Sequence, residues 1–107
     1  MKRFGQVIKV KPEKLAEYTE AHASVWPEVL EMITQCNLKN YSIYHYDGLL
    51  FAYFEYHGDD FEGDMARMAA HPKTQEWWEW MMPLQEPVAE RAEGEWWHSI
   101  DEVFHHD

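Results

Sequence analysis

The chain has 107 residues, close to the size of one ordinary domain, so we expect a single domain over residues 1–107. Its 20 Asp and Glu residues outnumber 9 Lys and Arg residues, and the net charge of −11 argues against a nucleic acid or an anionic membrane surface as partner. Apolar residues make up 46% of the chain, which excludes disorder, and aromatic residues make up 16%, more than so small a core can bury. Some of these rings should therefore line a pocket or a subunit interface.

The first third of the chain predicts one strand and then a helical region. Residues 4–10 are rich in apolar side chains and are followed by Lys11 and Pro12, which is typical of a strand that ends before a helix. Apolar and aromatic side chains then recur at helical spacing: Leu15, Tyr18, His22, Val25, Trp26, Val29, Leu30 and Ile33. Pro27 should kink this helix or break it into two, because it cannot bond to the carbonyl of Ala23. Asn37 is the expected end.

The middle of the chain predicts a β-hairpin. Residues 41–46 and 49–56 are rich in aromatic and aliphatic side chains. Asp47 and Gly48 lie between them, and this pair favours a two-residue turn because both positions tolerate a positive φ.

The last half of the chain predicts two helices, a loop and a closing strand. Asp59 or Asp60 can cap a helix through Phe61, Met65, Met68 and Ala69. Pro72 should begin a second helix, which contains the tryptophans at positions 77, 78 and 80. Residues 83–94 are expected to form a long loop, and residues 96–104 a strand.

The resulting order of strand, helix, strand, strand, helix, strand is that of a ferredoxin-like split βαβ domain of the α+β class. Helices on one face of its sheet would leave the other face bare and rich in aromatic side chains. Two such sheets packed face to face would bury these rings, so we expect a homodimer, a dimeric α+β barrel.

His22 is the first candidate for chemistry, because it lies four residues after Tyr18 and shares its helix face. A histidine on an apolar helix face is more often structural than catalytic, so periodicity alone favours the structural interpretation. Trp77 and Trp78 should point about 100° apart, so that one can face the core and the other a cavity. Tyr41 could offer its hydroxyl to the same pocket. For either tryptophan taken alone, ordinary packing is the favoured interpretation, and Tyr41 could be a strand tyrosine with a half-exposed ring.

Other patterns predict no cofactor. No HxxxH or CxxC spacing indicates a metal site, and no GxGxxG or P-loop pattern indicates a nucleotide.

Gln85, Glu90 and Arg91 lie in the predicted loop, where functional residues are common. Glu102 could bind a hydroxyl or face solvent. Cys36 is the one cysteine, so no internal disulfide can form, and we expect a buried apolar thiol. Without a visible signal peptide or a membrane-spanning run, the cytoplasm is the expected location.

Four groups of residues, in this order, resemble the L-rhamnose mutarotase family over essentially the whole chain. They are His22 with Trp26-Pro27-Glu28, then Asn40-Tyr41-Ser42-Ile43, then Trp77-Trp78, then Glu102-Val103-Phe104-His105. The resemblance implies a ferredoxin-like domain that dimerises through its sheets. It implies His22 as the proton donor, with Tyr18, Tyr41, Trp77 and Trp78 binding the sugar. With the resemblance, the catalytic interpretation of His22 becomes the favoured one.

The expected reaction is exchange of the two anomers of a 6-deoxy-L-hexose, a small neutral sugar, without cofactor or metal. The segments Glu79-Trp80-Met81-Met82-Pro83-Leu84 and Gly94-Glu95-Trp96-Trp97 indicate a subgroup of the family, so L-fucose stands as an alternative to L-rhamnose. Two further hypotheses stay open: a small dimeric monooxygenase that binds haem through His22, and a sugar-binding module without activity.

Overall fold

A tight turn at Asp47 and Gly48 joins the two strands of the predicted hairpin. In the computed structural model, which describes all 107 residues, both turn residues have positive φ, 50° and 78°. Strands β2 (Leu38–Tyr46) and β3 (Leu49–Tyr56) pair antiparallel directly from the turn, with Tyr46 opposite Leu49. The hairpin is thus confirmed, and it fixes the register of the sheet.

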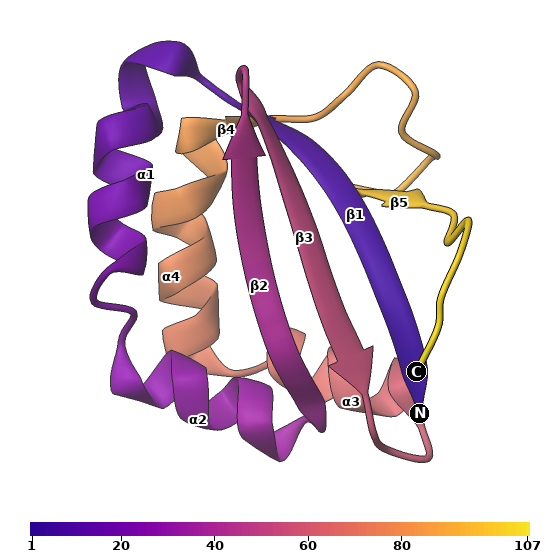
Figure 1. Ribbon diagram of the computed structural model, residues 1–107. Helices are drawn as coiled ribbons and strands as arrows, with labels where there is room; N and C mark the ends of the chain where they lie inside the picture. Colours follow the sequence, from indigo (N-terminus) through magenta and orange to yellow (C-terminus); the bar gives the residue numbers. More distant parts are fainter.

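Strand β1 (Lys2–Val10) pairs antiparallel with β3 and completes the centre of the sheet. Its other edge is shared by β4 (Gln85–Glu86), opposite Lys9 and Val10, and β5 (His98–Ile100), opposite residues 5–7. The spatial order β2-β3-β1-β4, with β5 also beside β1, is that of the predicted ferredoxin-like split βαβ fold (Figure 1).

The first helical region is broken into two helices, as the position of Pro27 predicts. A 3-10 turn (Pro12–Lys14) leads into α1 (Leu15–His22), and α2 (Pro27–Gln35) begins at the proline itself. Trp26, which precedes the proline, has ψ of 133° and so cannot continue a helix. The break places His22 at the end of α1 instead of in the middle of a longer helix.

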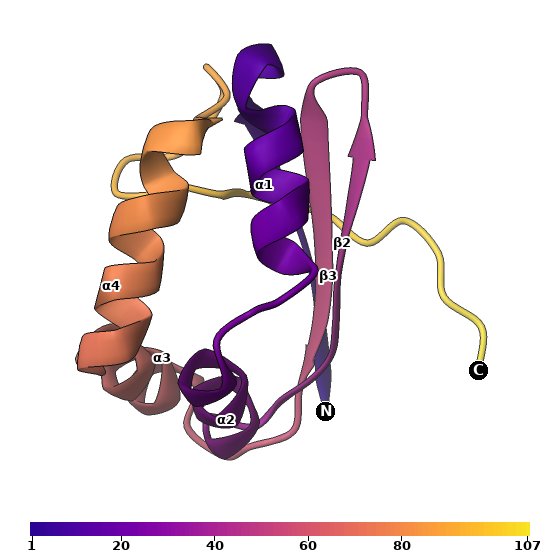
Figure 2. The same ribbon diagram turned by 90° about the vertical axis from the view of Figure 1, so that its left-hand side faces the viewer.

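The second helical region also follows the prediction. Asp60 is the residue that caps α3 (Phe61–Ala69), because its side chain accepts a hydrogen bond from the backbone N–H of Gly63 at 3.1 Å. Helix α4 (Pro72–Met81) begins at its proline. All four α-helices lie against one face of the sheet (Figure 2). None of them is both long enough and apolar enough to cross a lipid bilayer.

The predicted closing strand over residues 96–104 is wrong at both ends. The strand spans only His98–Ile100. Trp96 and Trp97 precede it and pack against the main core, and the residues after Ile100 are exposed and irregular. Glu102 forms a surface ion pair with Arg3 at 2.8 Å. The predicted loop over residues 83–94 is also interrupted, because part of it forms a 3-10 turn (Met82–Leu84) and β4.

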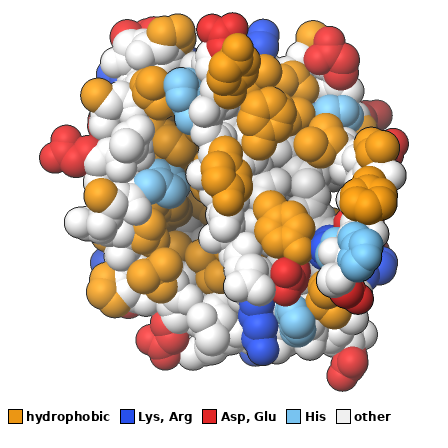
Figure 3. Space-filling model, in the orientation of Figure 1, with side chains coloured by type: hydrophobic (Ala, Val, Ile, Leu, Met, Phe, Trp, Pro, Cys, Tyr) orange, Lys and Arg blue, Asp and Glu red, His pale blue; other side chains and the backbone are white.

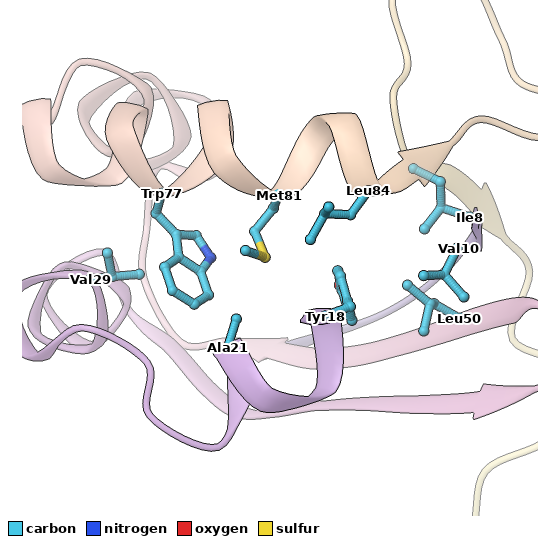
Figure 4. Packing of buried hydrophobic residues seen from close by; sticks show 9 residues of the cluster. All are labelled: Ile8, Val10, Tyr18, Ala21, Val29, Leu50, Trp77, Met81 and Leu84. Atoms are coloured by element: carbon cyan, nitrogen blue, oxygen red, sulfur yellow. The ribbon is translucent and has the colours of Figure 1, made fainter. Parts of the chain in front are cut away.

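Burial of the sheet's helix-facing side builds the core. Alternate residues of β3 from Leu50 to Tyr56 are buried, and so is Ile8 of β1. Figure 4 shows side chains of α1 and α4 pointing toward one another, with Ile8, Val10 and Leu50 of the strands beside them. This main cluster contains Ile8, Val10, Tyr18, Ala21, Val29, Leu50, Trp77, Met81 and Leu84. Cys36 is fully buried in a second cluster, as predicted, and is a free thiol.

The opposite face of the sheet carries no helix. By the register of β2 and β3, Tyr44 and Phe51 are neighbours on this side, as are Tyr46 and Leu49. Tyr44 and Tyr46 are exposed, and so is Ile100 of β5. Figure 3, which views the molecule from this side, shows hydrophobic side chains gathered over the strands. A cluster of exposed apolar side chains of this kind is typical of a surface that packs against another protein.

Candidate functional site

A half-open cleft of about 1450 Å³ separates part of the helical layer from the sheet. Of its 31 lining residues 22 are hydrophobic, so most of its wall is apolar. All five residues expected to form a site line this cleft: Tyr18 and His22 from α1, Tyr41 from β2, and Trp77 and Trp78 from α4. Three segments that are distant in the sequence thus bring the predicted set together.

His22 is the last residue of α1 and is half-buried. Its Nδ1 lies 2.8 Å from the backbone carbonyl oxygen of Tyr18, one helical turn earlier. A carbonyl oxygen only accepts hydrogen bonds, so Nδ1 carries the hydrogen and Nε2 is the atom that can exchange a proton. Nε2 has no hydrogen-bond partner in the protein. Burial lowers the pKa of His22 below its ordinary value, and the backbone hydrogen bond opposes part of this shift.

Tyr18 is buried beside His22, and their rings are stacked with centroids 4.2 Å apart. The phenol oxygen accepts a hydrogen bond from Nε2 of Gln85 at 3.2 Å. Burial raises the pKa of Tyr18 to about 12, so the phenol is neutral at physiological pH. Tyr18 is therefore a hydrogen-bonding group in this cleft and not an anionic base.

A β-bulge places Tyr41 at the cleft. The register of β2 against β3 shifts between Lys39 and Ser42, which gives β2 one extra residue. Asn40 takes a positive φ of 52° and bonds to Glu55, while the Tyr41 ring lies 5.3 Å from that of Phe54. Tyr41 as a whole is 39% exposed, but desolvation of its hydroxyl raises the pKa to about 12. This hydroxyl forms no hydrogen bond within the protein and is free for a ligand.

The adjacent tryptophans of α4 divide as their helical spacing predicts. Trp77 is buried, and its ring meets the edge of the His22 ring at a centroid distance of 5.3 Å. Trp78 also lines the cleft but is 37% exposed, so it forms the rim. Trp77 thus supports the imidazole from behind, and Trp78 offers a flat apolar surface to a ligand.

Two residues of the site have roles that their sequence positions do not indicate. Gln85 and Trp96 both line the cleft, and the indole N–H of Trp96 donates to Oε1 of Gln85 at 2.8 Å. Gln85 was expected only as one of several loop residues, and Trp96 as part of a strand. No local pattern marks them, because the bond between them depends on the pairing of β4 with β1.

The ionisable groups elsewhere do not form a second site of this kind. No group of three or more His, Cys, Asp and Glu side chains is placed to bind a metal ion. Glu55 accepts hydrogen bonds from Tyr53, His57 and Asn40, which lower its pKa to about 2. Glu55 and its partners Tyr53 and His57 are not among the residues that line the cleft.

Comparison with known proteins agrees with the geometry. The family model for L-rhamnose mutarotase matches residues 3–106. L-rhamnose mutarotases of Oceanobacillus iheyensis and Phocaeicola vulgatus are 30% and 33% identical to this chain, and each match covers 100% of both proteins. The L-rhamnose mutarotase of Bacillus subtilis is 34% identical over 78% of this chain and 80% of its own length.

Two solved structures share the fold. The L-rhamnose mutarotase of Formosa agariphila superposes with a TM-score of 0.77 at 22% identity, over 100% of both chains. Tetracenomycin F2 cyclase of Streptomyces glaucescens, a type-II polyketide cyclase, superposes with a TM-score of 0.71 at 16% identity, again over 100% of both chains. The fold therefore carries more than one chemistry, and the function must be argued from the site.

Proposed function

Because the chain belongs to the L-rhamnose mutarotase family, a family of isomerases, we propose that it interconverts the α and β anomers of L-rhamnose in this cleft. The observation that carries the proposal is the unpartnered Nε2 of His22, a residue that lines the same cleft as Tyr18, Tyr41 and Trp78. Anomer exchange of a free deoxysugar requires a group that carries a proton, hydroxyl groups that bind the sugar and an apolar wall that packs against its ring.

The cleft suits a 6-deoxy sugar for a physical reason. Trp77 and Trp78 line it with aromatic surface, which fits the C–H face of a sugar ring and its C6 methyl group. A sugar with a hydroxyl at C6 would leave that hydroxyl without a partner against the tryptophans, at a cost in affinity. The apolar wall therefore favours 6-deoxyhexoses as a class, and L-fucose is the alternative substrate.

We assign the proton transfer to His22. Protonated Nε2 gives its proton to the ring oxygen as the bond from C1 to the ring oxygen breaks, and the anomeric hydroxyl loses its proton to water as the carbonyl forms. Rotation about the C1–C2 bond then presents the other face of the aldehyde. Closure reverses each transfer, so that no proton is gained or lost and no cofactor is consumed.

The tyrosines serve as hydrogen-bonding groups in this scheme. Their pKa values of about 12 keep both phenols protonated, so we assign neither of them the role of base. Each can polarise the anomeric oxygen, which is the carbonyl oxygen of the open form and becomes negative while the ring closes. Tyr41 reaches the sugar from the sheet and Tyr18 from the helix.

We further propose that two copies of the chain pack through the bare face of the sheet. Tyr44, Tyr46 and Ile100 are exposed on this face, next to half-buried Phe51. Such a cluster of rings favours a second apolar surface over water. The symmetric arrangement of two sheets would give a dimeric barrel. The cytoplasm is the compartment in which we expect it, consistent with a free thiol at Cys36.

Saturation-transfer NMR of free sugars at anomeric equilibrium tests the proposed activity. The protein should accelerate anomer exchange of L-rhamnose above the uncatalysed rate, with L-fucose as the second test sugar and D-glucose as the 6-hydroxy control. Faster exchange of L-fucose than of L-rhamnose would replace the substrate and keep the mechanism. Binding of these sugars without faster exchange would show a binding module instead of an enzyme.

A further inference from the structure

The amide of Gln85 bridges an indole and a phenol at the inner end of the cleft. Its Oε1 accepts from the Trp96 Nε1–H at 2.8 Å, and its Nε2 donates to the Tyr18 hydroxyl at 3.2 Å. Gln85 is only 6% exposed. Such a buried polar side chain with two specific partners is expected to have a defined orientation.

The direction of the bridge follows from the indole. An indole N–H can only donate a hydrogen bond, so the carbonyl end of the amide must face Trp96. The NH₂ end is then left for Tyr18. The phenol oxygen consequently accepts on its inner side, and its own hydrogen must be donated elsewhere. The open direction is the cleft, which Tyr18 lines beside His22.

We propose that Gln85, fixed by Trp96, is a positioning residue that makes the Tyr18 hydroxyl a hydrogen-bond donor toward the sugar. This inference rests on the proposed function, since it gives the direction of one hydrogen bond in that reaction. With its proton aimed into the cleft, Tyr18 donates to the anomeric oxygen. This bond is strongest during ring closure, when negative charge develops on that oxygen.

Two segments hold the bridge in place. Gln85 opens β4, and Val10 of β1 lies directly opposite it in the sheet. The turn before β5 is closed by Glu95, whose carboxylate accepts from the backbone N–H groups of Ala92 at 2.7 Å and Ser99 at 3.3 Å. Trp96 follows Glu95 directly, so the indole that orients Gln85 is itself fixed by the loop.

Gln85→Glu tests the direction of the hydrogen bond with almost no change in shape. A carboxylate still accepts from Trp96 but can only accept from Tyr18, so the phenol hydrogen turns away from the sugar. At neutral pH we expect the kcat of anomer exchange to fall roughly tenfold, the usual effect of one hydrogen bond in a transition state.

The pH dependence of kcat distinguishes a positioning role of residue 85 from a purely structural one. Once protonated, the carboxyl introduced by Gln85→Glu can donate to Tyr18 as the amide does, so the ratio of variant to wild-type kcat should rise as the pH is lowered. The titration of His22 is fitted separately in each protein, because the introduced carboxylate changes the charge near the imidazole. A ratio that stays constant with pH in a folded variant, or a variant as active as the wild type at neutral pH, would overturn the proposal.

Trp96→Phe is the second variant, in case Gln85→Glu does not fold. It removes the bond that orients the amide, and we expect kcat to fall severalfold with little change in KM. Trp80→Phe is the matched control, because the Trp80 indole donates to Glu17 at the same 2.8 Å but outside the cleft. Equal kcat for the two variants would contradict the role of Gln85, whereas a wild type without anomer exchange would refute the proposed function itself.

Discussion

The imidazole of His22 is bonded to the backbone of Tyr18 and stacked on its phenol ring, with 2.8 Å between Nδ1 and the carbonyl oxygen and 4.2 Å between the ring centroids. One helical turn therefore fixes both the tautomer of the histidine and the plane of its ring. The consequence is that Nε2 is the only ring nitrogen available to a ligand. The Trp77 ring makes a T-shaped contact with the imidazole, with 5.3 Å between the centroids.

The pH dependence of exchange should report the lowered pKa of His22. Burial disfavours the imidazolium, so the pKa lies below the ordinary histidine value of 6.5. If the imidazolium is the proton donor, enzymatic kcat/KM should be constant below this pKa and fall about tenfold per pH unit above it. Rates are measured by saturation transfer from about pH 4.5 to about pH 8, a range that spans the titration of a histidine, with the protein-free exchange subtracted at each pH.

His22→Gln serves as the control for this profile. Glutamine does not titrate, so the residual rate of this variant should not follow the wild-type curve. A wild-type kcat/KM that falls as the pH is lowered through the same range would show that neutral His22 acts as a base on the sugar instead.

Trp78 and Trp80 provide a matched pair for sugar binding. Both side chains are 37% exposed on α4, but only Trp78 lines the cleft. Trp78→Ala should raise the KM for L-rhamnose roughly tenfold, because a sugar loses a flat apolar surface, while Trp80→Ala should leave it unchanged. Equal effects of the two substitutions would mean that the sugar does not contact Trp78.

Trp77 should affect stability more than Trp78 does. Its ring is buried in the main core cluster, where it meets His22 and Trp26. Trp77→Ala should lower the free energy of unfolding by about 3–5 kcal/mol, as other large-to-small substitutions of buried aromatic residues do. Urea unfolding followed by circular dichroism measures this difference. A loss below about 1 kcal/mol would show that the cavity wall does not depend on this ring.

The bare sheet face should hold the dimer together. Tyr44 of strand β2 is 67% exposed on this face, so Tyr44→Asp would bury a charge at the interface and should weaken dimerisation at least roughly tenfold. Ala16→Asp adds the same charge on the exposed side of α1 and should leave the dimer intact. Analytical ultracentrifugation of the two variants measures their monomer–dimer equilibrium. A wild-type protein that is monomeric at micromolar concentration would contradict the proposed assembly.

Much of the fold could be predicted because its signals are local. The Asp47-Gly48 turn, the prolines at positions 12, 27 and 72, and the helical spacing from Leu15 onward each act within a few residues. The last strand was predicted too long because the extent of an edge strand depends on its partner. The rings of Trp96 and Trp97 pack on the core instead of alternating across the sheet.

The site could be predicted only in part for the same reason. His22 follows Tyr18 by one turn, so their common face is visible in the sequence, and the paired tryptophans indicate both a core and a cavity role. Resemblance to the family was needed to favour a catalytic His22 and to connect it with Tyr41. The bridge runs from Trp96 through Gln85 to Tyr18. Gln85 and Tyr18 are 67 positions apart in the sequence, and no sequence pattern predicts the bond between them.

The most direct measurement of the central claim is the rate of L-rhamnose anomer exchange in His22→Ala, by saturation transfer at matched protein concentration. General acid–base catalysis by one group contributes about 10²–10⁴-fold, so the variant should lose at least roughly a hundredfold of the enzymatic rate while keeping its circular dichroism spectrum. A folded His22→Ala protein that exchanges anomers at the wild-type rate would contradict the account.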